Sequence, residues 1–477
     1  MKIQKKTKIV ATISDRNCEV SFLKQLYEAG MNVVRMNTAH QNTEGSLKVI
    51  NNVRQVSDRI ALMIDTKGPE VRTNPTEKGL EVKTGDRVYV KGAPGTKSYE
   101  NVICLSYEDI VDEVPLGSRL LIDDGDIELL VRSKEGDQLV CEARNPGIIL
   151  GRKSVNIPGI DVKLPALSEK DRVAIQLAID EDIDFIAHSF VRNKEDLLQI
   201  QEILDRHNSR VKIIAKIENQ SGVDNIDEIL DHSYGIMVAR GDLAIEMPYS
   251  KIPGIQKMLI NKCIEKRKPV IIATQMLHSM IYSPRPTRAE VSDIANAIYS
   301  QTDAIMLSGE TAYGKYPAES LKTMSVVACE VEKTKEPFND IPIEVAKNEV
   351  SAFLIKTAVQ AAVDLPARAI LADTETGLTI LRLSAYRGNR MIWAKCYDRR
   401  VVRELALTYG ANANYMDPVK NSYEFVERAV NSLLEDGSAK KDSRLVIIAG
   451  NFGHSTGASY IEIGSVNDLL TKVKRTI

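Results

Sequence analysis

The sequence predicts an α/β protein with a closed (β/α)8 TIM barrel, a small β domain inserted after the third barrel strand, and an α/β domain at the C-terminal end. Three observations lead to this prediction. Eight short apolar runs alternate with segments of helical periodicity, one long interval breaks that rhythm with alternating strands, and a second αβ alternation begins after Pro342.

The eight apolar runs are the predicted barrel strands: KIVATI, NVVRMN, ALMIDT, FIAHSF, KIIAKIE, GIMVAR, PVIIAT and AIMLSGE. Runs that are apolar on both faces indicate buried parallel strands. Amphipathic segments such as Val20 to Ala29 and Glu195 to Arg206 lie between them. Eight βα units favour a closed barrel. An open doubly wound sheet is the competing architecture, but the GxGxxG turn typical of such folds is missing from the sequence.

The interval from Glu70 to about Val162 contains the runs RVYVK, SRLLID, IELLVR and QLVCEA, separated by Gly-Asp turns. These signals predict a small antiparallel domain that lies over the barrel mouth and can close as a lid.

The C-terminal part follows a polar linker, KTKEPFNDIPIEVAKNE, which contains two prolines. A helix over Val350 to Asp364 and the strands RAILAD, MIWAKC and RLVIIAG predict a third globular unit with a regulatory role. The expected division is 1–69 and 163–341 for the barrel, 70–162 for the inserted β domain, and 342–477 for the C-terminal α/β domain.

Bulk composition narrows the function classes. Lys plus Arg total 63 against 65 for Asp plus Glu, so no excess charge favours nucleic acid or an anionic membrane, and a small-molecule partner is expected. No apolar run approaches the roughly 18 residues of a membrane span, and the N-terminal segment has no signal-peptide core, so a cytoplasmic location is expected. The six cysteines include no CxxC pair, which suits reduced thiols.

Polar residues follow the predicted strands at their carboxyl ends, where the active sites of such barrels lie. A polar residue in this position is usually only the first loop residue or a helix cap. So many together at one rim instead indicate a functional site. In strand order they are Arg35, Asn37, His40; Asp65, Thr66, Lys67; Ser189; Lys216, Glu218; Arg240, Asp242; Thr274, Gln275; and Ser308, Glu310.

Glu218 and Asp242 form the sharpest local feature. They are carboxylates on adjacent strands without a thiol or imidazole beside them, and such hard oxygen ligands suit Mg²⁺ or Mn²⁺. Lys216 lies two residues before Glu218, so both side chains point to one face of the strand. This lysine places a positive charge where phosphoryl negative charge develops. The plain alternative is a Lys–Glu ion pair inside the barrel.

Ten segments resemble the pyruvate kinase family in order and spacing, from Thr7 to about Pro317. They are TKIVATI, GMNVVRMN followed by His40, DTKGPEVRT, IDDG, LPALSEKD, KIIAKIEN, GIMVARGDL, PVIIATQML, PRPTRAEVSD and AIMLSGETAYG. Beyond Pro342 only the general αβ organisation fits. The resemblance implies transfer of the phosphoryl group of phosphoenolpyruvate to ADP, giving pyruvate and ATP in glycolysis, by a homotetrameric allosteric enzyme.

By this resemblance Arg35 and Lys216 contact the transferring phosphoryl group, and Glu218 and Asp242 hold Mg²⁺ or Mn²⁺. The substrate's carboxylate is expected at the backbone of Gly241 and Asp242 with the Thr274 hydroxyl. The nucleotide is expected at Asn37, His40, Arg72 and Lys153, of which the last two lie on the inserted domain. Ser308, with Glu310 nearby, matches a polar network that delivers the proton to enolpyruvate, and a water chain is the expected donor because serine and threonine are poor acids.

A potassium ion is implied at oxygens of Asn37, Asp65 and Thr66. Ala39 stands where the family usually places a serine hydroxyl, so one ligand is missing. Glu70 occupies the position whose glutamate goes with K⁺ dependence in the family, and its negative charge beside a phosphate site favours a cation. We therefore expect K⁺ activation with a raised half-saturating concentration.

An effector site is expected in the loop after RAILAD, where a glycine and hydroxyls begin a helix and offer an anion nest. The loop residues are Thr374, Glu375, Thr376, Gly377 and Thr379. An ordinary capped helix is the alternative. Family members regulated by fructose 1,6-bisphosphate often carry a basic residue there. Leu378 occupies that place, so we expect little response to this sugar bisphosphate.

Two other function classes remain open on the sequence alone. A barrel lyase or aldolase acting on pyruvate also uses paired carboxylates and Mg²⁺, although Arg72 and Lys153 on a lid argue for a nucleotide. The other is a non-catalytic homologue that senses metabolites, and the presence of both Lys216 and Glu218 argues against it.

Overall fold

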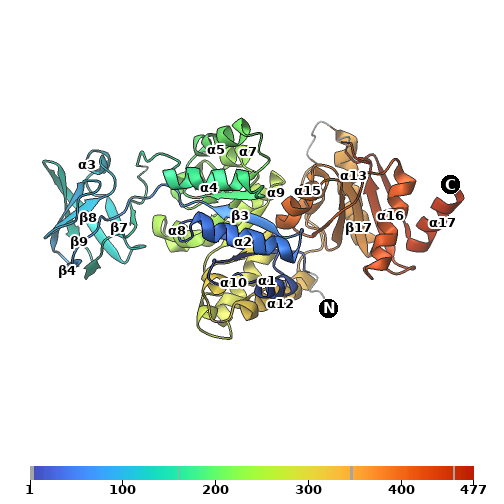
Figure 1. Ribbon diagram of the computed structural model, residues 1–477, viewed down its shortest axis with the longest axis horizontal. Helices are drawn as coiled ribbons and strands as arrows, with labels where there is room; N and C mark the ends of the chain where they lie inside the picture. The colour runs from blue at the N-terminus through green and yellow to red at the C-terminus, as the bar shows by residue number, and fades with distance from the viewer. Residues whose placement is uncertain (1–4, 161, 344–347, 455–456, 477) are drawn as a thin grey trace.

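The computed structural model describes residues 5–160, 162–343, 348–454 and 457–476, which form three domains in a row (Figure 1). The barrel lies in the middle, between the inserted domain and the C-terminal domain. Part of the expected linker, 344–347, and the last position but one of the expected inserted domain, 161, lie outside the described residues.

Eight parallel strands close the barrel in the order β1-β16-β15-β14-β13-β12-β3-β2, which confirms the predicted fold class. The strands are β1 (Lys8–Thr12), β2 (Val33–Asn37), β3 (Ala61–Asp65), β12 (Phe185–His188), β13 (Lys212–Ile217), β14 (Gly235–Ala239), β15 (Val270–Ala273) and β16 (Ala304–Leu307). Each of the eight apolar runs contains one of them.

Helices surround the barrel. They are α1 (Val20–Glu28), α2 (Thr43–Val56), α4 (Glu169–Asp180), α5 (Lys194–Arg206), α6 (Gln220–Asp224), α7 (Ile226–His232), α8 (Arg240–Glu246), α9 (Ile252–Glu265), α10 (Arg288–Tyr299), α11 (Gly309–Ala312) and α12 (Pro317–Thr334), with the 3-10 turns η1 (Tyr249–Lys251) and η2 (His278–Ile281). Local capping fixes several starts. Ser168 with Asp171 begins α4, and Thr287 with Glu290 begins α10, each as a reciprocal capping box.

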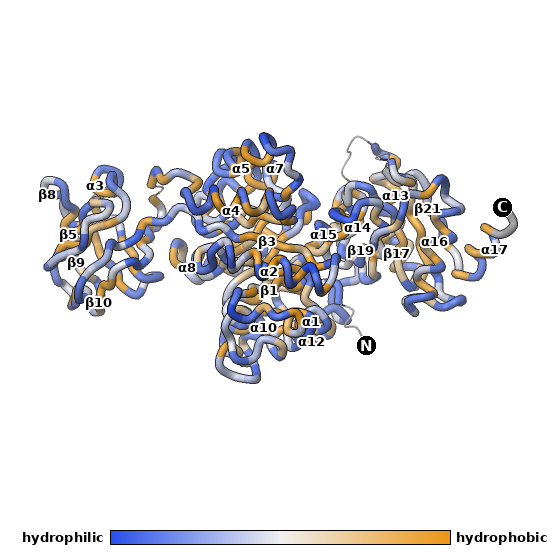
Figure 2. The backbone as a smooth tube through the Cα atoms, in the orientation of Figure 1, coloured by the Kyte–Doolittle hydropathy of each residue, from blue (hydrophilic) through white to orange (hydrophobic). Residues whose placement is uncertain are grey.

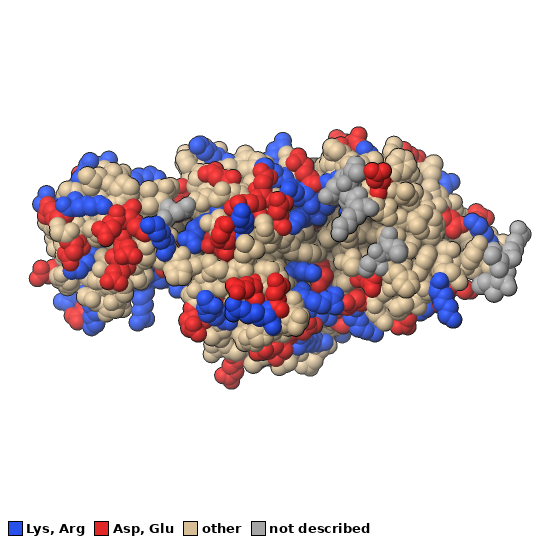
Figure 3. Space-filling model, turned by 90° about the horizontal axis from the view of Figure 1, so that it is seen from above, with Lys and Arg blue, Asp and Glu red and all other residues tan. Residues whose placement is uncertain are grey.

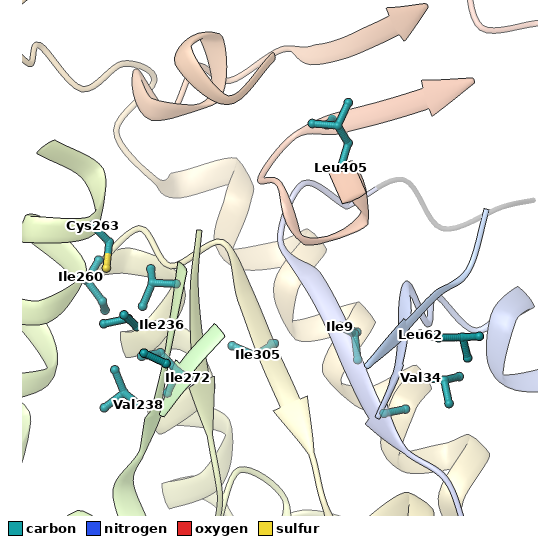
Figure 4. Close-up of a cluster of buried hydrophobic side chains, with 14 of the residues drawn as sticks. Ile9, Val34, Leu62, Ile236, Val238, Ile260, Cys263, Ile272, Ile305 and Leu405 are labelled. Carbon is teal, nitrogen blue, oxygen red and sulfur yellow. The ribbon is translucent and has the colours of Figure 1, made fainter. Parts of the chain in front are cut away.

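Side chains of the strands alternate between two apolar cores, as the period of two requires. Val10 and its counterparts on the other strands fill the barrel interior, while Ile9 and its counterparts pack against the helices. Figure 4 shows this outer layer, where Ile236, Val238 and Ile272 lie near Ile260 and Cys263 of α9. Burial of apolar area at about 25 cal/mol per Å² makes these layers the main stabilising contribution.

The inserted domain follows β3 and has its own core, including Val88, Leu120, Leu129 and Leu139. Its elements are β4 (Leu80–Val82), β5 (Arg87–Gly92), β6 (Val102–Leu105), α3 (Ile110–Glu113), β7 (Arg119–Ile122), β8 (Ile127–Glu135), β9 (Gln138–Ala143), β10 (Gly147–Ile149) and β11 (Val155–Asn156). The six-stranded sheet has the order β11-β7-β8-β9-β5-β6. The expectation of a fully antiparallel domain was wrong at one pair: β5 and β6 run parallel, because the connection over 93–101 carries the chain back before β6 begins.

The C-terminal domain has a five-stranded sheet of order β19-β18-β17-β20-β21, antiparallel only at β20–β21. Its elements are α13 (Glu349–Asp364), β17 (Ala369–Thr374), α14 (Leu378–Ala385), β18 (Met391–Cys396), α15 (Arg399–Glu404), η3 (Leu405–Leu407), β19 (Ala411–Tyr415), α16 (Ser422–Glu435), β20 (Arg444–Ala449), β21 (Tyr460–Ser465) and α17 (Val466–Thr476). The sequence did not predict β19 and β21, which form the two sheet edges.

The C-terminal domain closes the barrel at the amino ends of its strands. Ala406 and Leu407 pack into the interior core with Val10, Phe185 and Met237. The rim at the carboxyl ends therefore faces the other way, toward the inserted domain (Figure 1). This arrangement leaves the carboxyl rim as the open end of the barrel.

Surface composition agrees with the near-neutral charge balance. Apolar residues gather inside each domain and polar residues outside (Figure 2), and both signs of charge are interspersed over the face in Figure 3. All six cysteines are unpaired, and five of them are buried. Among the described residues, no helix has the length and apolarity needed to cross a membrane.

Candidate active site

The centre of the rim is an ion-paired group from three neighbouring strands. Arg35 of β2 donates through Nε to Asp65 of β3 at 2.5 Å, and its Nη1 donates to Thr12 at the end of β1 at 2.9 Å. Burial alone would raise the pKa of Asp65, but the charges of Arg35 and Lys216 outweigh it and hold that pKa below its usual value. Asp65 is therefore an ionised carboxylate that holds two cations.

Lys216, near the end of β13, places its ammonium between two carboxylates. Its Nζ lies 3.1 Å from Asp65 Oδ1, 2.9 Å from Glu218 Oε1 and 2.6 Å from Ser189 Oγ. Burial opposes the charge, but Asp65 and Glu218 raise the pKa of Lys216 above its usual value. The lysine is thus a permanent cation at the rim, and the predicted Lys–Glu contact is present.

Glu218, which is buried, and Asp242, which is partly buried, form a pair of carboxylates. Burial raises the pKa of Glu218 to about 7, with Lys216 opposing and Asp242 adding to the rise. The pKa of Asp242, which lies in the first turn of α8, is also raised, first by burial. Asp242 thus disfavours the ionised form of Glu218, and a divalent cation held by the two carboxylates would remove that repulsion.

The residues fit Mg²⁺ or Mn²⁺ as a partly open site. Among the residues that the structure describes, no group of three or more His, Cys, Asp or Glu side chains gathers as a metal site. Mg²⁺ typically uses one or two carboxylates together with water and substrate oxygens. A pair of carboxylates without further protein ligands matches this coordination pattern. A closed structural zinc site, in contrast, has four protein ligands.

A cavity of about 110 Å³ lies beside this pair, between the barrel and the inserted domain. Asp242, Phe190 and Asn219 line it from the barrel, and Asp124 and Asn156 line it from the inserted domain. Asn156 also donates to Glu246 of α8 at 3.4 Å across the same boundary. Asp242 of the carboxylate pair therefore faces the space between the two domains.

The strand ends beside Asp242 are tied together by Thr274. The Gly241 amide donates to Thr274 Oγ1 at 2.9 Å, and that hydroxyl donates to the Ala273 carbonyl at 2.7 Å. Thr274 has a left-handed backbone with φ 68°. The Gly241 amide, expected to be free for a substrate carboxylate, is thus already bonded, so a ligand there has to share or replace the Thr274 contact.

Ser308 follows β16 and reaches the centre only indirectly. Its amide donates to Glu310 Oε2 at 2.8 Å, and Glu310 Oε1 accepts from the Leu277 amide at 3.0 Å. Thr12 donates to the carbonyl of Leu307 at 3.0 Å while accepting from Arg35. Thr12 was missed in the sequence, because a threonine at a strand end is also the commonest kind of β residue.

The residues expected to serve a nucleotide lie in two places. Arg72 and Lys153 come from adjacent segments of the inserted domain, since Arg72 bridges Ser154. Both are ion-paired, Arg72 to Glu70 at 2.8 Å and Lys153 to Asp123 at 2.7 Å. His40 is exposed on the barrel, in the turn after β2.

The oxygens expected to bind K⁺ lie together where β2 and β3 end, since Asn37 and Asp65 are partners in register. Asn37 Oδ1 accepts from the Ala39 amide at 3.0 Å, and Thr66 Oγ1 lies 3.0 Å from Nδ1 of His188. Burial lowers the pKa of His188 to about 4, so this ring is neutral and adds no charge. Asp65 supplies the negative charge of the group.

The expected effector loop is an ordinary capped turn in the structure. The Gly377 amide donates to Thr374 Oγ1 at 2.9 Å, and Gly377 has φ 83°, which favours glycine. Thr374 and Thr379 are buried, whereas Leu378 is 48% exposed. The loop residues lie together, with Thr374 and Thr379 buried and Thr376 exposed.

The barrel fold and the charged rim together indicate a phosphotransferase. The family described as "Pyruvate kinase, barrel domain" matches residues 4–321, and "Pyruvate kinase, alpha/beta domain" matches residues 353–463. A pyruvate kinase of Borreliella burgdorferi is 48% identical, covering 98% of this chain and 99% of its own length. Those of Geobacillus stearothermophilus and Bacillus licheniformis are 41% and 40% identical, covering 98% of this chain and 82% of their own length. The chain belongs to the pyruvate kinase family.

Proposed function

We propose that this chain transfers the phosphoryl group of phosphoenolpyruvate to ADP, with Arg35 and Lys216 as the two cations that contact the transferring group. Phosphoryl transfer depends on positioned charge more than on covalent chemistry. Arg35 is fixed by Asp65 and Thr12, and Lys216 by Asp65 and Ser189. Both charges are therefore preorganised before the substrate binds.

Glu218 and Asp242 are the proposed ligands of Mg²⁺ or Mn²⁺. When bound, this cation supplies positive charge that stabilises the carboxylate and the enolate oxygen of the substrate. The carboxylates orient the ion, while Gly241 and Thr274 orient the substrate's carboxylate from the neighbouring strand ends. Because Gly241 and Thr274 are already hydrogen-bonded to each other at 2.9 Å, they form one rigid edge of the site.

The nucleotide is proposed to bind between the barrel and the inserted domain. Arg72 and Lys153 contribute charge from the inserted domain, and Asn37 and His40 contribute from the barrel. Their present partners, Glu70 and Asp123, keep both cations on the inserted domain's surface. Closure of this domain over the rim would bring the nucleotide phosphates to Lys216 and exclude water.

Protonation of enolpyruvate is proposed to involve Thr274 and Ser308. Neither hydroxyl is acidic enough to act alone, so a water chain held by Ser308 and Glu310 is the proposed donor.

Potassium is proposed at Asn37, Asp65 and Thr66. A homotetramer, a cytoplasmic location and an effector site at 374–379 stay predictions.

The observation that carries this proposal is the convergence of Arg35, Lys216, Glu218 and Asp242 from β2, β13 and the start of α8 at one rim. A coupled assay for pyruvate formation tests it. We expect turnover that needs phosphoenolpyruvate, ADP and a divalent cation together. Pyruvate formed without ADP would instead indicate a lyase, and no turnover with intact metabolite binding would indicate a sensor.

The divalent site is tested separately by Mn²⁺ binding in the presence of substrate. Glu218→Gln and Asp242→Asn should each weaken the affinity for Mn²⁺. Asp231→Asn, on the exposed surface of α7, is a matched control that should leave it unchanged. Unaltered Mn²⁺ binding in both site variants would show that the cation lies elsewhere.

A further inference from the structure

Lys216 has no spare hydrogen-bond donor in the structure. An ammonium group has three N–H donors, and Nζ of Lys216 has three oxygen partners: Ser189 Oγ at 2.6 Å, Glu218 Oε1 at 2.9 Å and Asp65 Oδ1 at 3.1 Å. Lys216 is only 8% exposed, so water competes little for these bonds. A phosphoryl group therefore has to replace one of the three partners.

The three partners differ in what else they bind. Glu218 is a proposed ligand of the divalent cation, so a bound cation would compete with Lys216 for its oxygens. Asp65 is shared with Arg35, whose Nε lies at 2.5 Å. Ser189 is the neutral partner, and its bond to Lys216 is the shortest of the three. Loading of the site thus frees the Glu218 bond and leaves Ser189 in place.

The Ser189 hydroxyl has a fixed orientation. Its nearest acceptor is the backbone carbonyl of Thr66 at 2.8 Å, ahead of Asp65 Oδ1 at 3.4 Å, so the proton is directed to Thr66 and the lone pairs are left for the ammonium of Lys216. Ser189 is 2% exposed and Thr66 is 1% exposed. The hydroxyl is therefore an acceptor aimed at Lys216, held from behind by a strand end.

The backbone around Ser189 holds its hydroxyl close to Lys216. Phe190 adopts a left-handed conformation with φ 56°, and its amide donates to Glu218 Oε2 at 2.7 Å. Gly68, with φ 72°, packs so closely that a Cβ there would lie 2.7 Å from Ser189 Cβ. One two-residue turn after β12 thus holds Lys216 by a side chain and Glu218 by a backbone amide.

We propose that Ser189 is a positioning residue for phosphoryl transfer: its hydroxyl keeps the Lys216 ammonium at the phosphoryl position once Glu218 is taken up by the divalent cation. This inference rests on the proposed function and adds a residue to it. Ser189 acts through Lys216 and does not itself touch the substrate.

A merely structural role for the hydroxyl has a different consequence. Loss of a buried hydrogen bond that only supports the loop would lower stability and weaken every ligand of the rim alike. Loss of a bond that aims Lys216 would weaken only ligands that carry a phosphoryl group. Oxalate, a dicarboxylate without a phosphoryl group, is therefore the comparison probe for phosphoenolpyruvate.

The experiment measures equilibrium binding of both ligands to the full chain with Mn²⁺ and without ADP. A hydrogen bond to a charged group is typically worth about tenfold or more in affinity. We expect Ser189→Ala to weaken phosphoenolpyruvate binding about tenfold and to lower kcat similarly. Oxalate and Mn²⁺ affinities should stay within about twofold. Ser320→Ala removes another buried serine hydroxyl, bonded only within α12, and should change none of these values.

Two further variants keep the inference falsifiable. Ser189→Cys preserves the side-chain volume with a weaker acceptor and should fall between wild type and Ser189→Ala. In a Lys216→Met background, Ser189→Ala should have no additional effect on phosphoenolpyruvate affinity, since both changes act through the same charge. Equal weakening of both ligands, an additive effect in the Lys216→Met background, or wild-type binding by Ser189→Ala would each overturn the inference. Failure of the proposed function is distinct from these outcomes, because the wild-type chain would then form no pyruvate.

Discussion

The two ends of the barrel both bury charged groups, but they arrange them differently. At the end closed by the C-terminal domain, Asp303 receives Arg387 in a two-pronged contact, at 3.0 Å and 2.6 Å. The amides of Tyr409 and Val270 complete its bonds. At the open rim, Asp65 divides its oxygens between two cations, and burial together with Asp242 raises the pKa of Glu218. At the closed end both oxygens of Asp303 have partners, whereas the rim leaves negative charge to be neutralised by a ligand.

This difference shows what identifies a functional site. Burial of ions does not, since Arg387 is among the most buried large side chains of the chain. A raised pKa alone does not either. Burial also raises the pKa of Asp184, at the closed end, to about 6, although Arg403 pairs with it at 2.7 Å. What marks the rim is an interacting pair of carboxylates, Glu218 and Asp242, of which Asp242 lines a cavity between two domains.

The closed end is tested first, because its expected effect is the largest. Arg387→Met leaves Asp303 buried without its partner, which typically costs about 3–5 kcal/mol. We expect a matching fall in the stability of the barrel against urea, with kcat per folded molecule unchanged. Adding Asp303→Asn should restore part of the loss. A loss of stability below about 1 kcal/mol would show that the ion pair does not hold the domains together.

Lys216→Met makes the corresponding change at the rim. Removing one preorganised charge of this kind typically lowers the rate on the order of 10²-fold or more. Urea stability and Mn²⁺ affinity should change little, because Asp65 keeps Arg35. Lys212→Met, at the opposite end of the same strand, is the matched control and should keep near-normal kcat. Near-normal turnover in Lys216→Met would contradict the assignment of its charge to the transferring group.

The charged residues of the rim were largely predictable from the sequence. The charged contacts of the closed end were not. Residues after each apolar run must gather at one rim once eight parallel strands close. That rule alone brought Arg35, Asp65, Lys216 and Glu218 together before the structure was known. Their order along the chain carries the information, because strand direction is the same for every βα unit.

Contacts between distant segments were not predictable in this way. Arg387, which follows α14, meets Asp303 of the barrel across 84 positions of the chain, and no local pattern in the sequence predicts that contact. The sequence analysis also did not predict the edge strand β19, because its residues ANANY have small and amide side chains that suit many conformations. Similarly, the left-handed backbone of Phe190 is unusual for a large residue and depends on its bond to Glu218.

A smaller effect is expected from pH at the rim. The pKa of Glu218 in the fold is about 7, above the ordinary 4.5, so its protonated form is favoured without a cation. The raised pKa of Glu218 contributes to the free energy of unfolding below pH 4.5, and this contribution is lost as the pH rises through about 7. Protons compete with the cation, so Mn²⁺ affinity should rise about tenfold between about pH 6 and about pH 8. Glu218→Gln should remove the pH-dependent change in stability, and a flat Mn²⁺ affinity would refute the raised pKa.

The smallest effect concerns the monovalent cation, where the rim has one oxygen fewer than the family pattern. Glu70 adds negative charge near the proposed phosphate site, and it is paired with Arg72 and Lys67 in the structure. Asn37, Asp65 and Thr66 gather where β2 and β3 end, and Ala39 contributes no side-chain oxygen beside them. Losing one neutral ligand weakens a cation site modestly, because water can replace it. We therefore expect K⁺ activation with a raised half-saturating concentration.

Ala39→Ser restores the missing hydroxyl and should lower the half-saturating K⁺ concentration on the order of threefold to tenfold, the range of one ordinary hydrogen-bonding contact. Ala39→Val adds bulk without an oxygen and should not lower the half-saturating concentration, which separates ligation from packing. Equal turnover in K⁺ and in a bulky tetraalkylammonium salt of matched ionic strength would show that the negative charge of Asp65 is already satisfied by Arg35 and Lys216. In that case the open rim would resemble the closed end at this position, because every charge would have its partner within the protein.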